Sequence, residues 1–182
     1  DMSIRSMWGW NDNNNLIYAM AEVFDDVHIA DRDTPNAWWA DDAWEIYVDP
    51  LHIEPTEQDQ DAGTKTSLNV SFPPGPPGTN AIGQMLPPFE WRDEAEDGIQ
   101  WGIGWGFEGE MYGESTYFYE IWFKPWDFIS PDGDIASVEW SDLEEDQLIH
   151  MSMAFDDDDD GGTERTNFWS TSDNTCCAAD SD

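Results

Sequence analysis

The sequence predicts an all-β fold, an antiparallel β-sandwich of the jelly-roll type in a single domain. Apolar and polar residues alternate with a period of two in one segment after another, whereas the period of helices is nearly absent. These segments are short, and links rich in turn-forming residues separate them. Aromatic residues make up 14% of the 182 residues, including 12 tryptophans, so the chain can build a folded core despite a formal net charge of −35.

Eight segments are expected to form the strands. They comprise residues 3–10, 16–24, 43–49, 67–72, 99–107, 117–124, 149–155 and 166–169. The first two flank the turn-forming run at 11–15 and are predicted to form a hairpin. The alternation is strictest at 99–107, where glycines occupy one face and leave room for a bulky ring or another backbone. Pro125 ends the sixth segment because proline has no N–H to donate to a ladder.

Two segments are predicted to lie outside the sheets. The proline- and glycine-rich run at 73–78 cannot join a central ladder and is expected to be a loop insertion. The small, polar stretch at 171–182 is expected to be a tail or linker that follows a domain covering residues 1–170. Cys176 and Cys177 are adjacent and poorly placed to pair with each other, so either one pairs with a cysteine elsewhere or both are free thiols.

The charge restricts the partners of this domain. The chain has 41 acidic residues against 6 lysines and arginines, which excludes nucleic acids and anionic membranes as partners. We expect adaptation to high salt or to bound cations, since repulsion on such a surface needs screening. No apolar run of about 18 residues occurs, so no membrane insertion is expected. The chain begins with Asp and has no signal-like segment, which favours a mature product or a fragment.

Four motifs follow one another along the chain. They are the Trp-Asn-Asp to Leu-Ile-Tyr hairpin from Trp10, the Trp-Ala-Asp-Asp-Ala-Trp-Glu-Ile-Tyr-Val-Asp-Pro segment from Trp39, the Tyr-Glu-Ile-Trp-Phe-Lys-Pro-Trp segment from Tyr119, and the acidic turn after Met153 that leads to Trp169. In this order they resemble the family 9 carbohydrate-binding modules (CBM9) and the wider DOMON-like β-sandwiches. The resemblance implies a sugar-binding β-sandwich of the kind found in xylanases and other secreted glycan-active proteins.

The resemblance also implies that a sugar is held between two tryptophans, at the positions of Trp39 and Trp169 in this chain. A flat aromatic ring in the loop before strand 43–49 suits the apolar face of a pyranose, and the alternative is that it caps the core. Selectivity would come from polar neighbours. We expect these to be Asp41, Asp42, Asn69 and Arg165.

Three departures from the family pattern favour a second interpretation. The family's first strands have no counterpart, so the chain is expected to begin inside the domain. The stretch at 66–70, which supplies Gln and Arg in sugar-binding members, has no arginine, and no closing strand is recognisable after Trp169. The alternative function is therefore a structural or adhesive domain of a cell-surface or extracellular assembly that does not bind sugar.

The acidic run at 156–161 predicts a cation site. It fits the first half of a calcium loop, in which alternate carboxylates, here Asp156, Asp158 and Asp160, converge on one ion. Asn167 stands where an EF-hand has its bidentate Glu, so a complete EF-hand is not predicted. The family resemblance also implies structural calcium, while a solvated acidic run is the alternative. A second, weaker group comprises Asp25, Asp26, Asp42 and Glu45.

A noncatalytic role is predicted, at most as an ancillary domain of a glycan-active enzyme. Among 41 acidic residues some pair fits any catalytic template, and His28, His52 and His150 show neither metal spacing nor a triad partner. Some DOMON-like relatives bind haem, so Met20 or Met151 with His150 is a less favoured alternative. The leading prediction is a calcium-stabilised module that binds a polysaccharide or glycan, extracellular or at the cell surface, and linked to other domains of a larger protein.

Overall fold

The computed structural model describes residues 2–29, 41–51, 66–71, 82–84, 101–111, 113–128, 135–161 and 165–171. For residues 66–71 and 82–84, and at positions 101 and 135, the description covers the backbone alone. Several predictions fall outside these ranges. They concern Trp39, His52, the run at 73–78, Cys176 and Cys177.

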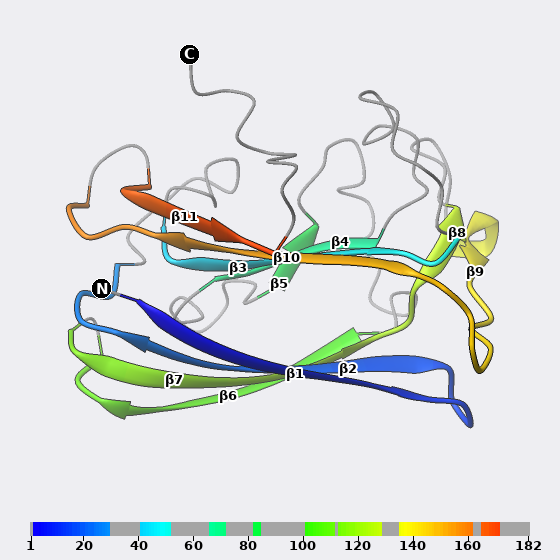
Figure 1. The fold of residues 1–182 in the computed structure, drawn as a ribbon, viewed down its shortest axis with the longest axis horizontal. Helices are drawn as coiled ribbons and strands as arrows, with labels where there is room; N and C mark the ends of the chain where they lie inside the picture. The colour runs from blue at the N-terminus through cyan, green and yellow to red at the C-terminus, as the bar shows by residue number, and fades with distance from the viewer. Residues whose placement is uncertain are drawn as a thin grey trace, which may run out of the picture.

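Two antiparallel sheets face each other and form a sandwich (Figure 1). The first sheet has the order β1 (Ser3–Asn11), β2 (Leu16–Asp25), β7 (Ser115–Phe123), β6 (Trp101–Gly109). The second has the order β11 (Asn167–Ser170), β10 (His150–Asp157), β3 (Ala43–Asp49), β4 (Thr66–Ser71), β5 (Ile82–Gln84). A separate pair, β8 (Trp126–Phe128) and β9 (Glu139–Trp140), flanks the short 3₁₀ helix η4 (Ile135–Ser137). The predicted all-β sandwich is confirmed.

The N-terminal hairpin forms where the sequence predicted it. β1 and β2 pair from Ser3 opposite Phe24 to Asn11 opposite Leu16. The turn ends on Asn15 with φ of 52°, a conformation that asparagine tolerates better than most residues. The indole of Trp10 donates a hydrogen bond of 3.0 Å to the Asn15 side chain, which fixes the turn against the strand that precedes it.

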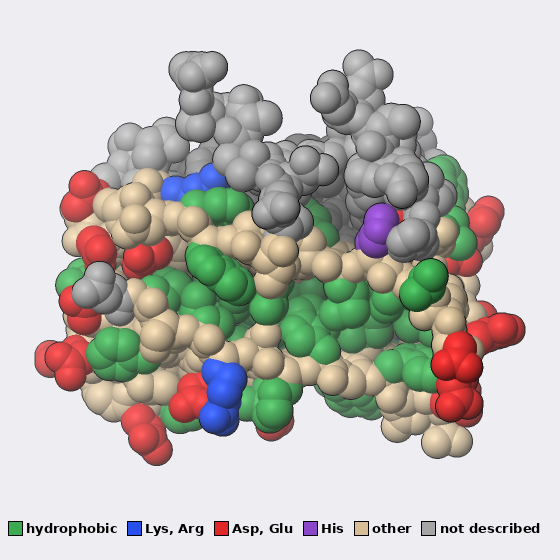
Figure 2. Space-filling model, in the orientation of Figure 1, with side chains coloured by type: hydrophobic (Ala, Val, Ile, Leu, Met, Phe, Trp, Pro, Cys, Tyr) green, Lys and Arg blue, Asp and Glu red, His purple; other side chains and the backbone are tan. Residues whose placement is uncertain are grey.

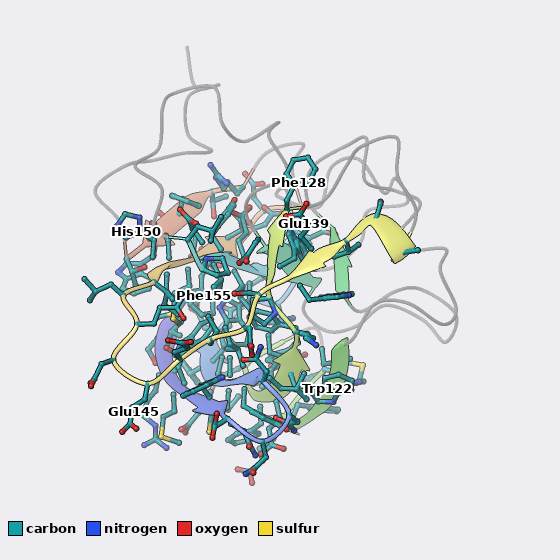
Figure 3. All side chains as sticks on the ribbon, turned by 90° about the vertical axis from the view of Figure 1, so that its right-hand side faces the viewer. Trp122, Phe128, Glu139, Glu145, His150 and Phe155 are labelled. Atoms are coloured by element: carbon teal, nitrogen blue, oxygen red, sulfur yellow. The ribbon has the colours of Figure 1, made fainter. Side chains whose placement is uncertain are left out.

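The core lies between the two sheets, where hydrophobic side chains gather (Figure 2). Its centre is Trp44 of β3, which is fully buried and stacks on Phe155 of β10 with ring centroids 5.7 Å apart and planes 7° apart. Trp8 of β1 meets the same indole edge-on at 6.0 Å. Figure 3 shows Phe155 between the two sheets. Aromatic contacts therefore join β1 of the first sheet to β3 and β10 of the second.

The glycine face predicted along the fifth segment does receive a bulky ring. At Gly102 of β6, a Cβ atom would lie 2.5 Å from Nε1 of Trp122, so the indole occupies the space that the missing side chain leaves. Three short strands were not predicted, namely β5, β8 and β9. Met151, expected inside, is half-exposed. No helix among the described residues has the length and apolar character to cross a membrane.

Candidate functional site

The alternation of β3 and β10 divides the second sheet into a core face and an outer face. Trp44 points into the core, so Glu45 and Tyr47 lie on the outer face. On β10, Phe155 points into the core and Asp156 lies on the outer face. The register places Ala154 and Asn69 on either side of Glu45 in the neighbouring strands. The predicted sugar residue Asn69 is thus the ladder partner of Glu45.

Glu45, Asp156 and Arg165 form a polar network on this outer face. Arg165 Nη1 donates to Asp156 Oδ1 at 2.6 Å, and the guanidinium lies 4.1 Å above the ring of Phe168. The hydroxyl of Tyr47 donates to Glu45 at 2.8 Å. Burial and the negative charge of Glu45 raise the pKa of Asp156, while the charge of Arg165 opposes that rise. Arg165, predicted to contact sugar, is therefore held by a buried carboxyl group that the sequence assigned to calcium.

Trp169 lies on β11, the edge strand of the second sheet, and faces away from the polar network. β11 pairs with β10 so that Trp169 stands opposite Phe155, which places it on the core face at the border of the sheet. Its ring lies 6.0 Å from the Phe155 ring at an angle of 46°, and 51% of the residue is exposed. The predicted platform is thus accessible and supported from beneath by a buried ring. It does not share a face with Arg165.

Asp42 has contacts different from those that sugar binding requires. The residue is fully buried, its Oδ2 accepts the N–H of Ile29 at 2.6 Å, and its Oδ1 accepts the N–H of Asp158 at 2.8 Å. Burial raises the pKa of Asp42 to about 9 despite these two hydrogen bonds. Both oxygens accept backbone N–H groups inside the protein, so Asp42 joins the segments around Ile29 and Asp158, and its contact with sugar stays a prediction.

The carboxylates predicted to bind calcium do not converge. Asp156 turns to Arg165, Asp158 is buried, and Asp160 is exposed. Among the described residues, two other acidic groups have ligand atoms within 4.8 Å of one another. They are Asp25, His28 and Asp42, and Asp25, Asp157 and Asp159. The turn itself is as sharp as predicted, because Gly161 adopts φ of 63°.

The residue pairs considered for haem are not brought together. His150 and Met151 are successive residues of β10, so their side chains leave opposite faces of the second sheet. Met20 pairs with Met7 and Glu120 on the outer face of the first sheet, away from His150. Two axial ligands of one haem must reach the same iron, and neither pair has that placement.

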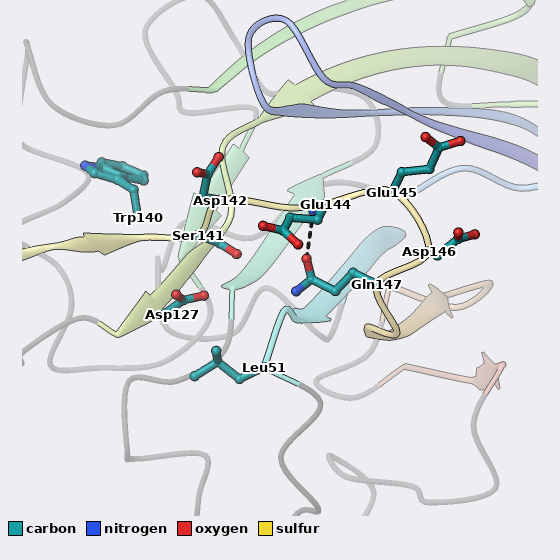
Figure 4. A pocket seen from close by; sticks show the side chains of 9 residues that line it. All are labelled: Leu51, Asp127, Trp140, Ser141, Asp142, Glu144, Glu145, Asp146 and Gln147. Atoms are coloured by element: carbon teal, nitrogen blue, oxygen red, sulfur yellow. Dashed lines mark hydrogen bonds between the residues drawn. The ribbon is translucent and has the colours of Figure 1, made fainter.

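An acidic depression lies beside β8 and β9, at the opposite end of the sandwich from the turn between β10 and β11 (Figures 1 and 4). Its volume is about 520 Å³, and the N–H of Glu144 donates to the Gln147 side chain within it at 2.9 Å. The carboxylates that line it are Asp127, Asp142, Glu144, Glu145 and Asp146. Such a lining repels anions, and clustered acidic groups are common in so acidic a chain.

The chain resembles family 9 carbohydrate-binding modules in part of its sequence and in its fold. The profile of the family described as carbohydrate family 9 binding domain-like matches residues 3–71. A structure of a family 9 carbohydrate-binding module from Caldicellulosiruptor kristjanssonii, in complex with glucose, shares the fold with a TM-score of 0.54 and 16% identity, over 96% of this chain and 69% of that chain. No curated protein matches the sequence. The chain is thus similar to this family in sequence over residues 3–71, and its two sheets share the fold of a family 9 carbohydrate-binding module.

Proposed function

We propose that this chain is a noncatalytic glycan-binding module that stacks a neutral sugar on Trp169. The single observation that carries the proposal is the half-exposed indole of Trp169, which rests against the buried ring of Phe155 at the edge of the second sheet. An exposed ring held in this way offers a flat apolar surface without a large loss of side-chain entropy on binding. The glucose complex of the structural relative gives a sugar as the ligand class to test first.

The outer-face network supports this platform from the other side of β11. Arg165 packs on Phe168 and pairs with Asp156, so the chain just before Trp169 is anchored to β10. Trp39 is the second ring of the clamp in this proposal, on the strength of the family resemblance. The proposal also includes an extracellular location and linkage to further domains.

A specific observation favours the alternative, a structural domain of an extracellular assembly. Two of the residues predicted to contact sugar, Asp42 and Arg165, make their hydrogen bonds within the protein. A fold that has lost its ligand would keep such contacts because they stabilise the sheets. The two functions therefore differ in whether Trp169 contacts anything outside the chain.

The test is retention of the whole chain on immobilised glycans. Neutral glucans and xylans are expected to retard it in affinity electrophoresis, and free glucose or a soluble oligosaccharide is expected to compete. Polyuronates of equal length serve as the control, because a chain of net charge −35 repels them. Absence of retention on every neutral glycan would favour the structural alternative.

We also propose that the domain works in concentrated salt. Lowering NaCl from about 1 M to about 0.01 M lengthens the screening distance from roughly 3 Å to roughly 30 Å, so repulsion among carboxylates reaches across the surface. We expect the melting temperature to fall by several degrees and the near-UV circular dichroism of the aromatic core to weaken. Sucrose at equal osmolality is the control for effects other than screening. A melting temperature independent of salt would contradict this proposal.

A further inference from the structure

We propose that the edge strand β1 pairs with β1 of a second copy of this chain, so that two sandwiches join through their first sheets. This goes beyond glycan binding. Among the described strands only β2 pairs with β1, which therefore forms an edge of the first sheet. The pairing runs over all nine residues of β1 without a register shift, so the backbone groups on its other side form a regular row. An extended strand is the partner that such a row fits.

β1 lacks the features with which proteins protect an exposed edge. Its sequence, Ser-Ile-Arg-Ser-Met-Trp-Gly-Trp-Asn, contains no proline, no lysine and no acidic residue, and its ladder has no bulge. Its one charged residue, Arg5, is paired with Glu22 of β2 at 2.9 Å. A long, regular edge whose charge is neutralised within its own sheet favours pairing with another strand.

The flank of the sandwich beside β1 leaves part of the core uncovered. On β1, the side chains of Ile4, Trp8 and Trp10 pack against the core but are only partly buried. On β10, Met151 has the same strand parity as the core residue Phe155, yet 42% of it is exposed. Figure 2 shows this flank, with hydrophobic side chains in a strip between the two sheets. A second copy at β1 would shield this strip from water as well as complete the ladder.

The charge of this flank suits a copy of the same chain. Each copy carries a formal net charge of −35, so two copies repel one another wherever their carboxylates face. The segments that form the flank, residues 2–11, 147–155 and 165–171, contain no acidic residue. They hold two of the six lysines and arginines, Arg5 and Arg165. Two copies can therefore meet here with few carboxylates between them, and concentrated salt screens the rest of the surface.

Antiparallel pairing of two β1 strands closes the assembly at two copies. The contact is isologous, because the same strand of each copy pairs with its counterpart about a two-fold axis. The result is one continuous sheet, in which the order β6-β7-β2-β1 of one copy is followed by β1-β2-β7-β6 of the other. Each copy loses its exposed edge at β1, so no further copy can be added there.

The test is sedimentation equilibrium of the whole chain in about 1 M NaCl, where screening is short-ranged. We expect a monomer–dimer equilibrium with a Kd of about 1–100 µM, which weakens at least about tenfold in about 0.01 M NaCl. Met151→Asp places a carboxylate on the flank of each copy and should raise the Kd by at least about tenfold. Met111→Asp, at a 37% exposed methionine between β6 and β7, is the matched control and should dimerise as the parent does.

Amide hydrogen exchange of the parent chain gives a second measurement that needs no variant to fold. Raising the protein concentration from well below to well above the Kd should slow exchange in residues 3–11 of β1. Exchange in residues 101–109 of β6, at the other end of the same sheet, should not change.

The remaining outcomes overturn the β1 pair. A monomer at every concentration in 1 M NaCl would mean that no second copy binds this edge. A dimer without concentration-dependent protection of β1, or equal Kd values for the two variants, would place the contact elsewhere. Growth beyond two copies would indicate a contact that does not close. No glycan is present in these measurements, so their result does not depend on the glycan proposal.

Discussion

Replacing Trp169 by alanine is expected to abolish retention on neutral glycans while the domain stays folded. Removal of a central aromatic anchor from a binding surface costs about 2 kcal/mol or more, roughly a 30-fold rise in Kd. The effect on folding should be much smaller because half of the residue is already exposed and its neighbour Phe155 remains buried in the core. The measurement is affinity electrophoresis at matched protein concentrations, with thermal unfolding of the same samples.

The control for this substitution is Trp122→Ala. Trp122 has 37% of its surface exposed, and it lies on the outer face of the first sheet, far from β11 (Figure 3). Its loss should leave retention unchanged, whereas a general affinity of exposed indoles for the matrix would lower retention in both variants. Equal retention of Trp169→Ala and the parent would show that the platform is not at Trp169.

The two sheets were predictable because alternation is a local property. Residues 43–49 alternate strictly, and the structure forms β3 over that same range with Trp44 inside and Glu45 outside. The short strands β5, β8 and β9 span two or three residues, too few for a period of two to be recognised. Strand length therefore limited what the sequence could predict of the fold.

The composition of the candidate site depends on register, which a single sequence does not contain. A strand was expected at 166–169, but only its pairing with β10 decides that Trp169 lies on the core face beside Phe155. The sequence prediction placed Glu45 in a weak metal group. Its neighbours in space, Asp156 and Arg165, come from distant parts of the chain and could not be recognised from the sequence. The one local signal was that Glu45 directly follows Trp44 in the alternating strand, which places the two side chains on opposite faces.

The acidic run shows a similar limit. The loop template brings carboxylates at alternate positions together, and this assumes that the run is a loop throughout. β10 instead continues to Asp157, so successive side chains leave opposite faces, with Asp156 outside and Asp157 towards Asp25 of the other sheet. The carboxylates that lie close together are therefore the odd-numbered Asp157 and Asp159 instead of Asp156, Asp158 and Asp160, and they are joined by Asp25 of β2.

The largest loss of stability is expected from Trp44→Ala. Trp44 is fully buried between Phe155 and Trp8, so truncation removes the aromatic contacts that join β1, β3 and β10 and leaves a cavity between the sheets. Such substitutions cost about 3–5 kcal/mol. The indole Nε1 has no hydrogen-bond partner among the described residues, so this cost comes from packing rather than from a lost hydrogen bond.

Trp44→Phe separates packing from chemistry at this position. A phenyl ring keeps a stacking partner for Phe155 and removes the buried N–H, so the variant should lose about half as much free energy of unfolding as the alanine variant. Urea denaturation in high salt measures both as shifts of the midpoint at unchanged slope. A loss below about 1 kcal/mol for the alanine variant would mean that this aromatic stack does not hold the sheets together.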